Sequence, residues 1–169
     1  MLTGKTLKAT SSAYAQEKGL DVLQKEKNVT LWKQNSDVEK ANEMMKNTIA
    51  EVLDIRIEAI AEDSLTASMP VDHRTHQPMG ILHGGASVVL AETVGSMAAM
   101  MAAEPGKACV GLDINANHLR KVVSGRVTAV AKPIHIGRTT HVWDIRICDE
   151  QQRDICISRL TMAVIDMQV

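Results

Sequence analysis

The segment that most constrains this chain is a largely apolar stretch of residues, 85–103, that carries a single charged side chain, Glu92. Apolar residues occupy nearly every side of the helix that this stretch would form, which is typical of a helix covered from several directions. Glu104, Pro105 and Gly106 follow and predict the end of that helix. The chain must therefore supply a surface that surrounds one long helix.

Runs rich in β-branched residues supply that surface. Two short runs joined by a turn precede the helix and four longer runs follow it: 55–60, 65–69, 109–116, 125–132, 141–148 and 155–165. The turns between the later runs are expected at 121–124, 133–138 and 149–154. We therefore predict an α+β fold in which a curved antiparallel sheet wraps the helix, with a second subunit as one way to cover the rest of it.

The first 35 residues have a different composition, rich in Lys, Gln, Ser and Thr, with only a weak amphipathic pattern. We expect residues 1–35 to form an appended arm of unknown role and residues 36–169 to form the domain. The sequence from Ser36 to Glu39 has the pattern of a capping box, which predicts a helix that runs to about Leu53.

The overall composition excludes several classes of protein. A length of 169 residues suits one domain, and a formal charge of −1 provides no basic field for nucleic acid or an acidic membrane. The three cysteines have no Cys-x-x-Cys spacing, which argues against a disulfide framework. No secretion signal is recognisable, and no run of uninterrupted apolar residues approaches the length of a membrane span. The sequence thus predicts a cytoplasmic protein that binds neither nucleic acid nor a membrane.

Glu92 is the best indication of function. Burying an ionised carboxylate without a partner costs several kcal/mol, so such a group is usually paired, protonated or part of a reaction. Ser96 lies four residues further on and shares its helix face. Loss of water would raise the pKa of Glu92 toward values useful to a general base. The alternative is a structural carboxylate that accepts hydrogen bonds at a subunit interface.

His83, Gly84 and Gly85 open the same helix, where backbone N–H groups lack acceptors and the macrodipole is positive. Glycine there lets a substrate carbonyl approach the backbone, although Gly-Gly is also a common flexible helix entry. Gly84 precedes Glu92 by eight residues, about 12 Å along a helix. Two such helices packed antiparallel about a two-fold axis would bring Gly84 of one to Glu92 of the other.

Other sites have less support. His73, His76 and His83 with Asp72 resemble a metal cluster by composition only, because the first two lie on a polar loop, and we expect no metal and no cofactor. The sequence has no Gly-x-Ser-x-Gly elbow and no glycine-rich phosphate loop. This argues against serine hydrolases and the common nucleotide-binding folds.

Three motifs together resemble a known family: MPVDHRTHQPMGILHGGASVVLAETVGS, VGLDINANHLR and SRLTMAVI. They are similar to the hotdog-fold acyl-CoA thioesterases of the phenylacetate/4-hydroxybenzoyl type, above all to the bacterial 1,4-dihydroxy-2-naphthoyl-CoA thioesterases of menaquinone synthesis and to their enterobactin-pathway proofreading relatives. The resemblance covers about residues 53–165. It implies a hotdog fold and a homo-oligomer, at least a dimer and in this family a tetramer.

The resemblance also implies roles for individual residues. Glu92 would be the nucleophile or general base, the Gly84 N–H would polarise the thioester carbonyl, Gln77 and His83 would orient the substrate, and Ser96 would position it or the attacking water. The residues placed along the coenzyme A path are Gly111, His118, Arg120, His135, Gly137 and Arg138.

Three functions follow as hypotheses. The first is hydrolysis of an acyl-CoA thioester with an aromatic hydroxyacyl group such as 1,4-dihydroxy-2-naphthoyl. The second is proofreading of a misacylated carrier protein in siderophore synthesis. The third is a non-catalytic module that binds acyl-CoA, since a fold does not settle function.

Overall fold

The computed structural model describes residues 30–34 and 37–167. The chain divides into two compact units, Met1–Thr30 and Leu31–Val169, and the second is described here. Nearly all of the predicted arm, residues 1–35, thus lies outside the described residues, and its role stays open.

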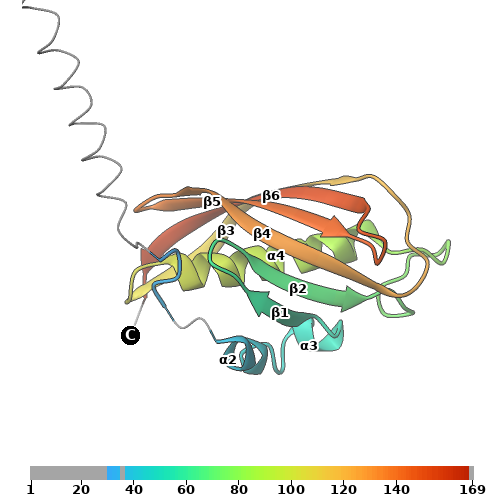
Figure 1. The fold of residues 1–169 in the computed structure, drawn as a ribbon, viewed down its shortest axis with the longest axis horizontal. Coiled ribbons are helices and arrows are strands. Elements are labelled where there is room, and N and C mark those ends of the chain that lie inside the picture. The colour runs from blue at the N-terminus through green and yellow to red at the C-terminus, as the bar shows by residue number, and fades with distance from the viewer. Residues whose placement is uncertain (1–29, 35–36, 168–169) are drawn as a thin grey trace, which may run out of the picture. The chain divides into compact units, whose positions relative to one another are not determined.

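One long helix and six strands make up most of the described chain (Figure 1). The elements are α2 (Val38–Glu43), α3 (Ile49–Val52), β1 (Arg56–Ile60), β2 (Leu65–Pro70), α4 (Gly84–Ala102), β3 (Lys107–His118), β4 (Arg126–Ile136), β5 (Thr140–Cys148) and β6 (Asp154–Asp166). All six predicted runs form strands, and the apolar stretch forms α4.

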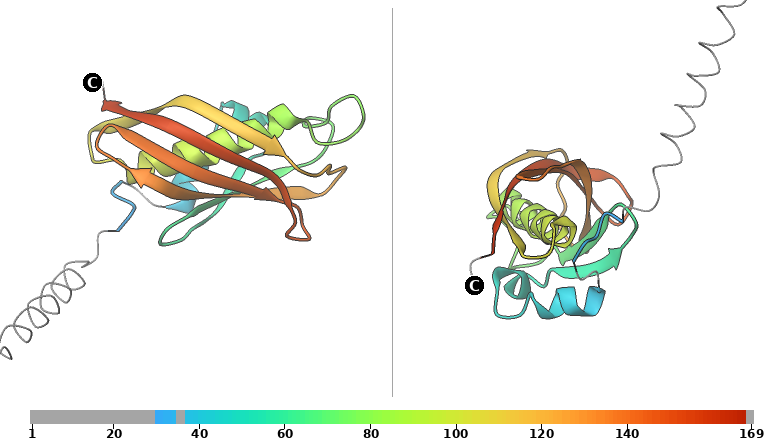
Figure 2. Two further views of the ribbon diagram at one scale, coloured as in Figure 1. Left: turned by 90° about the horizontal axis from the view of Figure 1, so that it is seen from above. Right: turned by 90° about the vertical axis from the view of Figure 1, so that its left-hand side faces the viewer.

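The strands form one antiparallel sheet in the order β1-β2-β4-β5-β6-β3. The sheet curls around α4, which is seen nearly end-on inside it in the right-hand view of Figure 2. The predicted α+β architecture with a wrapped central helix, the hotdog fold, is therefore confirmed.

Small residues let α4 lie close to the sheet. The buried face of the helix includes Ala91, Ala98 and Ala99, and a β-carbon added at Gly95 would stand 2.6 Å from Cδ2 of Leu160 on β6. Leu90 and Val94 fill the remaining space and are fully buried. The close approach fixes where each end of α4 lies relative to the strands.

The predicted helix from Ser36 to Leu53 is wrong in its extent. Ser36 lies outside the described residues, and the observed N-cap is Asp37, whose carboxylate accepts from Lys40 N at 2.9 Å. The helix stops after one and a half turns, Asn47 adopts φ 59°, and Thr48 caps the separate helix α3. A capping box signals where a helix starts but does not determine its length.

Strand boundaries also differ because of β-bulges. The predicted turn at 133–138 begins too early, since β4 continues to Ile136 across a bulge between Pro133 and His135. A bulge allows a proline, which cannot donate to a ladder, to stay within a strand. A second bulge lies between Ile57, which is buried, and Ala59, which is exposed.

One further expectation needs correction. With 19 residues, α4 is long and apolar enough to cross a membrane by length and composition, contrary to the prediction that no segment approaches this. Half of that stretch is buried against the protein itself, as expected for the core helix of a globular domain.

The chain just before α2 packs onto the domain. Trp32 stacks on the fully buried Trp143 of β5 with ring centroids 6.4 Å apart, and Lys33 N and Gln34 N donate to Met101 O at 2.8 and 2.9 Å. The C-terminal end of α4 thus receives two donors for one of its unpaired carbonyls.

The packing of α4 leads to a stability prediction. Leu90→Ala removes a fully buried side chain and should lower the free energy of unfolding by about 2–5 kcal/mol. Val52→Ala, on the exposed face of α3, should change it by less than about 0.5 kcal/mol. Urea denaturation at one protein concentration measures both, and equal effects would contradict the assigned core.

Candidate active site

The N-terminus of α4 is capped by a histidine. His83 has extended backbone angles (φ −70°, ψ 132°), and its Nδ1 accepts from Gly85 N at 2.8 Å. A β-carbon at position 85 would lie 2.9 Å from that nitrogen, so glycine allows the imidazole to reach the backbone. His83 therefore acts locally as the N-cap of the helix.

The neighbouring N–H of Gly84 stays available. It forms no hydrogen bond with the described residues. A β-carbon at position 84 would stand 2.8 Å from Nε2 of His118, at the end of β3, so the imidazole lies directly against this glycine. A free donor at the positive end of a 19-residue helix is suited to a carbonyl oxygen that gains negative charge.

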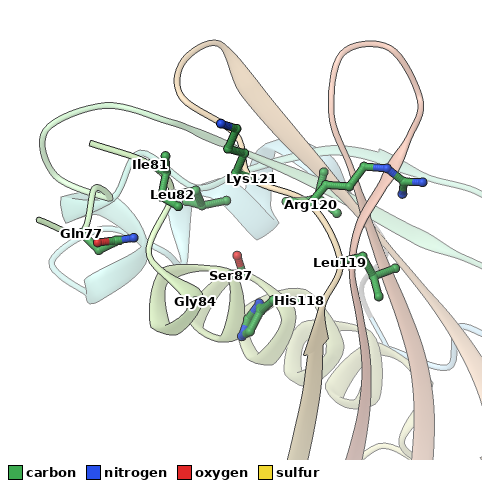
Figure 3. Close-up of a pocket in the computed structure, with 10 residues that line it drawn as sticks. Gln77, Ile81, Leu82, Gly84, Ser87, His118, Leu119, Arg120 and Lys121 are labelled. Atoms are coloured by element: carbon green, nitrogen blue, oxygen red, sulfur yellow. The ribbon is translucent and has the colours of Figure 1, made fainter. Parts of the chain in front are cut away.

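A cavity of about 350 Å³ opens at this helix end (Figure 3). It is lined by Gln77, Ile81, Leu82, Gly84, Ser87, His118, Leu119, Arg120, Lys121 and Ile155. Oε1 of Gln77 accepts from Met79 N at 2.9 Å, which fixes one end of its amide. The mixed apolar and polar lining suits a ligand with an apolar body and a few polar atoms.

Glu92 lies elsewhere, midway along α4 where the helix faces β3. Its Oε1 is 2.6 Å from the position that a β-carbon on Gly111 would occupy. The strand has a bulge between Gly111 and Asp113, so the carboxylate rests against a backbone that has no side chain there.

Burial raises the pKa of Glu92 above its ordinary value. No cation or hydrogen-bond donor of the described chain is paired with this carboxylate to offset the loss of water. Ser96, which shares its helix face, directs its hydroxyl to Sδ of Met162 at 3.8 Å instead. The carboxylate is therefore partly desolvated and has no partner among the described residues.

The remaining predicted residues lie at the turn between β4 and β5. A β-carbon at Gly137 would be 2.5 Å from Nε2 of His135, so glycine makes room for that imidazole. Gly137 and Arg138 line a second cavity, of about 380 Å³, at the C-terminal end of α4. Lys33, Lys107 and the buried His141 also line it, and burial lowers the pKa of His141.

One chain therefore distributes the predicted site residues over three places. Gln77, His83, Gly84, His118 and Arg120 gather at the start of α4, although the guanidinium of Arg120 also donates to Asp154 O. Glu92, Ser96 and Gly111 lie midway along α4, and His135, Gly137 and Arg138 lie near its end.

Sequence reasoning missed some residues of both cavities. Ser87 lines the first, and Lys33 lines the second. Ser87 stands three residues after Gly84 on the same helix, a spacing from which its position could have been inferred.

The histidines considered as metal ligands have other contacts. His76 Nε2 lies 3.1 Å from Val123 O, and His83 is the N-cap. Within residues 30–34 and 37–167 no three His, Cys, Asp or Glu side chains converge as a metal site would require.

A long central helix wrapped by a six-stranded antiparallel sheet is the hotdog thioesterase fold. The family model described as "Thioesterase superfamily" matches residues 79–156. The chain belongs to this superfamily and is an acyl-CoA thioesterase.

Individual relatives are similar over nearly their whole length. The 1,4-dihydroxy-2-naphthoyl-CoA hydrolase of Escherichia coli is 50% identical over 80% of this chain and 99% of its own. The proofreading thioesterase EntH of Cronobacter turicensis is 47% identical over 79% and 98%. The solved structure of a variant of thioesterase PA1618 from Pseudomonas aeruginosa has a TM-score of 0.79 at 59% identity, over 81% and 99%.

A more distant structure has been solved in two informative variants. SAV0944 of Staphylococcus aureus is 38% identical, with a TM-score of 0.68 over 70% of this chain and 99% of that one. Its variants replace a glutamate and a glutamine with alanine, and the two positions are fifteen residues apart.

The raised pKa of Glu92 leads to a prediction about stability. The pKa of this carboxyl is about 4.3 in the unfolded chain and higher in the folded one, so between the two values the folded chain binds more protons. The contribution of Glu92 to the free energy of unfolding is therefore most favourable at low pH. It is lost as the pH rises through the pKa of the folded state. Glu92→Gln cannot ionise and should exceed the wild type in stability at pH 8, with the difference shrinking below about pH 4.

Thermal unfolding across this pH range measures the effect. Glu62→Gln, at an exposed turn, is the matched control and should show no such pH-dependent difference. A Glu92→Gln variant that is less stable than the wild type at pH 8 would show that the ionised carboxylate is stabilised by a partner.

Proposed function

We propose that this enzyme hydrolyses an aromatic hydroxyacyl-CoA thioester such as 1,4-dihydroxy-2-naphthoyl-CoA, with Glu92 as the nucleophile or general base and the Gly84 N–H as the oxyanion donor. The observation that carries this proposal is the unpaired, desolvated carboxylate of Glu92 against Gly111. The naphthoyl substrate is suggested by the relative at 50% identity, whose name states that activity. A role in menaquinone synthesis in the cytoplasm follows from the same similarity.

A composite site best explains the separation of the two groups. Gly84 and Glu92 are about 12 Å apart along α4, and Glu92 does not line the cavity at Gly84. A nucleophile and an oxyanion donor must converge on one carbonyl. A partner chain related by a two-fold axis would bring its Glu92 to this cavity.

The exposed edge of the sheet favours such a partner. β3 ends the strand order, and its 12 residues include the exposed side chains of Val110 and Leu112. A long edge strand with exposed apolar residues is a ready surface for association. We propose a dimer through this edge, and a tetramer built from two such dimers.

The other predicted residues fit supporting roles in this arrangement. Gln77 and His83 would orient the acyl group at the start of α4, and Ser96, one turn from Glu92, would position the acyl group or the attacking water. The coenzyme A path would run past Gly111, His118 and Arg120. In an antiparallel pair it would continue to the partner's cavity at the end of α4, which Gly137 and Arg138 line and beside which His135 lies against Gly137.

The solved variants of a relative support the pair of Gln77 and Glu92. These residues are fifteen positions apart in this chain, the same separation as the glutamine and glutamate replaced in SAV0944. Replacement of both residue types by alanine, at the same spacing, is expected if the two residues act together in catalysis.

Two routes of hydrolysis are compatible with Glu92. As a nucleophile, the carboxylate adds to the thioester carbon, expels the thiolate and leaves an anhydride that water cleaves. As a general base, it removes a proton from water while that water adds to the same carbon. In both routes the carbonyl oxygen becomes negative next to the Gly84 N–H.

Proofreading of a misacylated carrier protein is the second candidate, because EntH is 47% identical over nearly its whole length. Both candidates break the same thioester bond and differ in what carries the acyl group. The third hypothesis, a non-catalytic binding module, is not retained, since the chain is a thioesterase.

A substrate panel distinguishes the two candidates. We expect kcat/KM for 1,4-dihydroxy-2-naphthoyl-CoA to exceed that for aliphatic acyl-CoA thioesters by at least about tenfold, a difference of about 1.4 kcal/mol in transition-state binding. An aryl carrier-protein thioester is measured beside them with free-thiol detection. A preference for the carrier-bound substrate would favour proofreading, and a preference for aliphatic acyl groups would contradict both.

Mixed oligomers test the composite site. Glu92→Gln should lower kcat by about 10²- to 10⁴-fold. Gly84→Pro removes the N–H at the first helical position, where proline is tolerated, and should also be inactive. Random mixing of the two inactive chains should restore about a quarter of wild-type activity, because half of the dimers contain one intact site of two.

Gly84→Ala is the matched control, since it adds the same β-carbon near His118 but keeps the N–H. Its activity should exceed that of Gly84→Pro. Light scattering should show a dimer or tetramer, whereas a monomer, or mixed chains that stay inactive, would contradict a site shared between subunits.

A further inference from the structure

Ser87 is a polar residue in a position where the helix otherwise buries small apolar side chains. Ser87 is only 2% exposed, yet it lines the cavity at the start of α4 (Figure 3). In that view the hydroxyl projects from the helix into the space beneath Leu82 and Arg120, beside His118. The catalytic roles proposed above do not involve this residue.

The hydroxyl has no partner among the described residues. A serine in a helix commonly bonds back to the carbonyl four residues earlier, but His83 O accepts from the backbone N–H of Ser87 at 3.2 Å and no bond from its Oγ is formed. Among the described residues only Nε1 of Trp143 is a fully buried polar side-chain atom without a partner, so the Ser87 oxygen is open to the cavity and available to a ligand. An alanine would suit this helix better, and alanine occupies the neighbouring position 86.

Helix geometry directs this hydroxyl toward Gly84. Residues three apart are neighbours on a helix surface, and each Cα–Cβ bond tilts toward the N-terminus. The side chain of Ser87 therefore covers the first turn, where the free N–H of Gly84 lies, and both residues line the same cavity. This relation holds within one chain and does not depend on a partner.

We infer that the Ser87 hydroxyl is a second hydrogen-bond donor to the thioester carbonyl oxygen, alongside the Gly84 N–H. This inference rests on the proposed function. When the nucleophile adds to the carbonyl carbon, the π electrons of the C=O bond move to oxygen, and the oxyanion accepts hydrogen bonds from both groups. The tetrahedral species then returns those electrons to the C=O bond and releases coenzyme A as its thiolate, while the Ser87 proton stays on Oγ.

The competing role is recognition of a hydroxyl group on the acyl moiety. The two roles differ in which substrates are affected. An oxyanion donor acts on every thioester, because the carbonyl oxygen is common to all of them, whereas a residue that binds an acyl hydroxyl matters only for hydroxylated acyl groups.

The test compares Ser87→Ala with the wild type on hydroxylated and unsubstituted aromatic acyl-CoA thioesters. We expect kcat to fall by about 10- to 100-fold for both substrates with little change in KM, since the interaction forms in the transition state. The thermal midpoint should stay about equal, because the hydroxyl forms no hydrogen bond with the described residues that the variant would lose. A merely structural serine would lower the midpoint and leave kcat unchanged.

Two further variants complete the experiment. Ser158→Ala removes a comparably buried hydroxyl from β6 that does not line the cavity, and it should keep wild-type kcat. Ser87→Cys keeps the shape with a weak donor and should also lose at least about tenfold in kcat.

Three results would overturn the inference: wild-type kcat in Ser87→Ala, a loss confined to hydroxylated substrates, or wild-type kcat in Ser87→Cys. Each of these would leave the role of Glu92 intact. Failure of the proposed function would instead appear as absent thioester turnover in the wild type or as full activity of Glu92→Gln.

Discussion

The close packing of α4 against the curled sheet is the interaction on which the rest of the structure depends. Gly95 lets the helix backbone approach Leu160 and Ile145, and alanines on the same face keep the distance short along its length. Because protein interiors are close-packed, the position of α4 on β5 and β6 determines which residues of β3 contact the helix. Gly111 faces Glu92 and His118 lies on Gly84 as a consequence.

Three glycines serve this geometry by what they lack. At positions 84, 85 and 111 a β-carbon would stand within 3 Å of His118, His83 and Glu92 respectively. Each glycine therefore lets a side chain lie against backbone, and at Gly84 and Gly111 the contact joins segments that only the fold brings together. Such positions illustrate why functional sites accept residues that are poor for local stability.

Two polar groups of α4 also do not contribute to the stability of the fold. Its N-terminus leaves one N–H unpaired beside a capped one, and its middle holds a carboxylate whose pKa burial has raised. Neither feature stabilises the folded chain. Both leave a group ready to interact with something outside the chain, which agrees with membership of an enzyme family and not of a structural one.

Local patterns predicted a good part of this molecule. The six strands, α4 and the glycines at its start could be read from residue order, because hydrophobic period and helix signals are local properties. The bulges at Pro133 and Ile57 could not, since they depend on how neighbouring strands align, and the capping pattern at the start of α2 did not determine where that helix ends. Ser87 was overlooked for a related reason: only the cavity distinguishes it from any other serine in a helix.

The sequence by itself thus determined the fold class, the family and the identity of the unusual carboxylate, because these depend on the order and type of residues. The tertiary structure decided that Glu92 rests on Gly111 with no partner among the described residues, that His118 lies against Gly84, and that these groups lie apart within one chain. Such distances arise from packing between segments far apart in sequence, which no local pattern encodes.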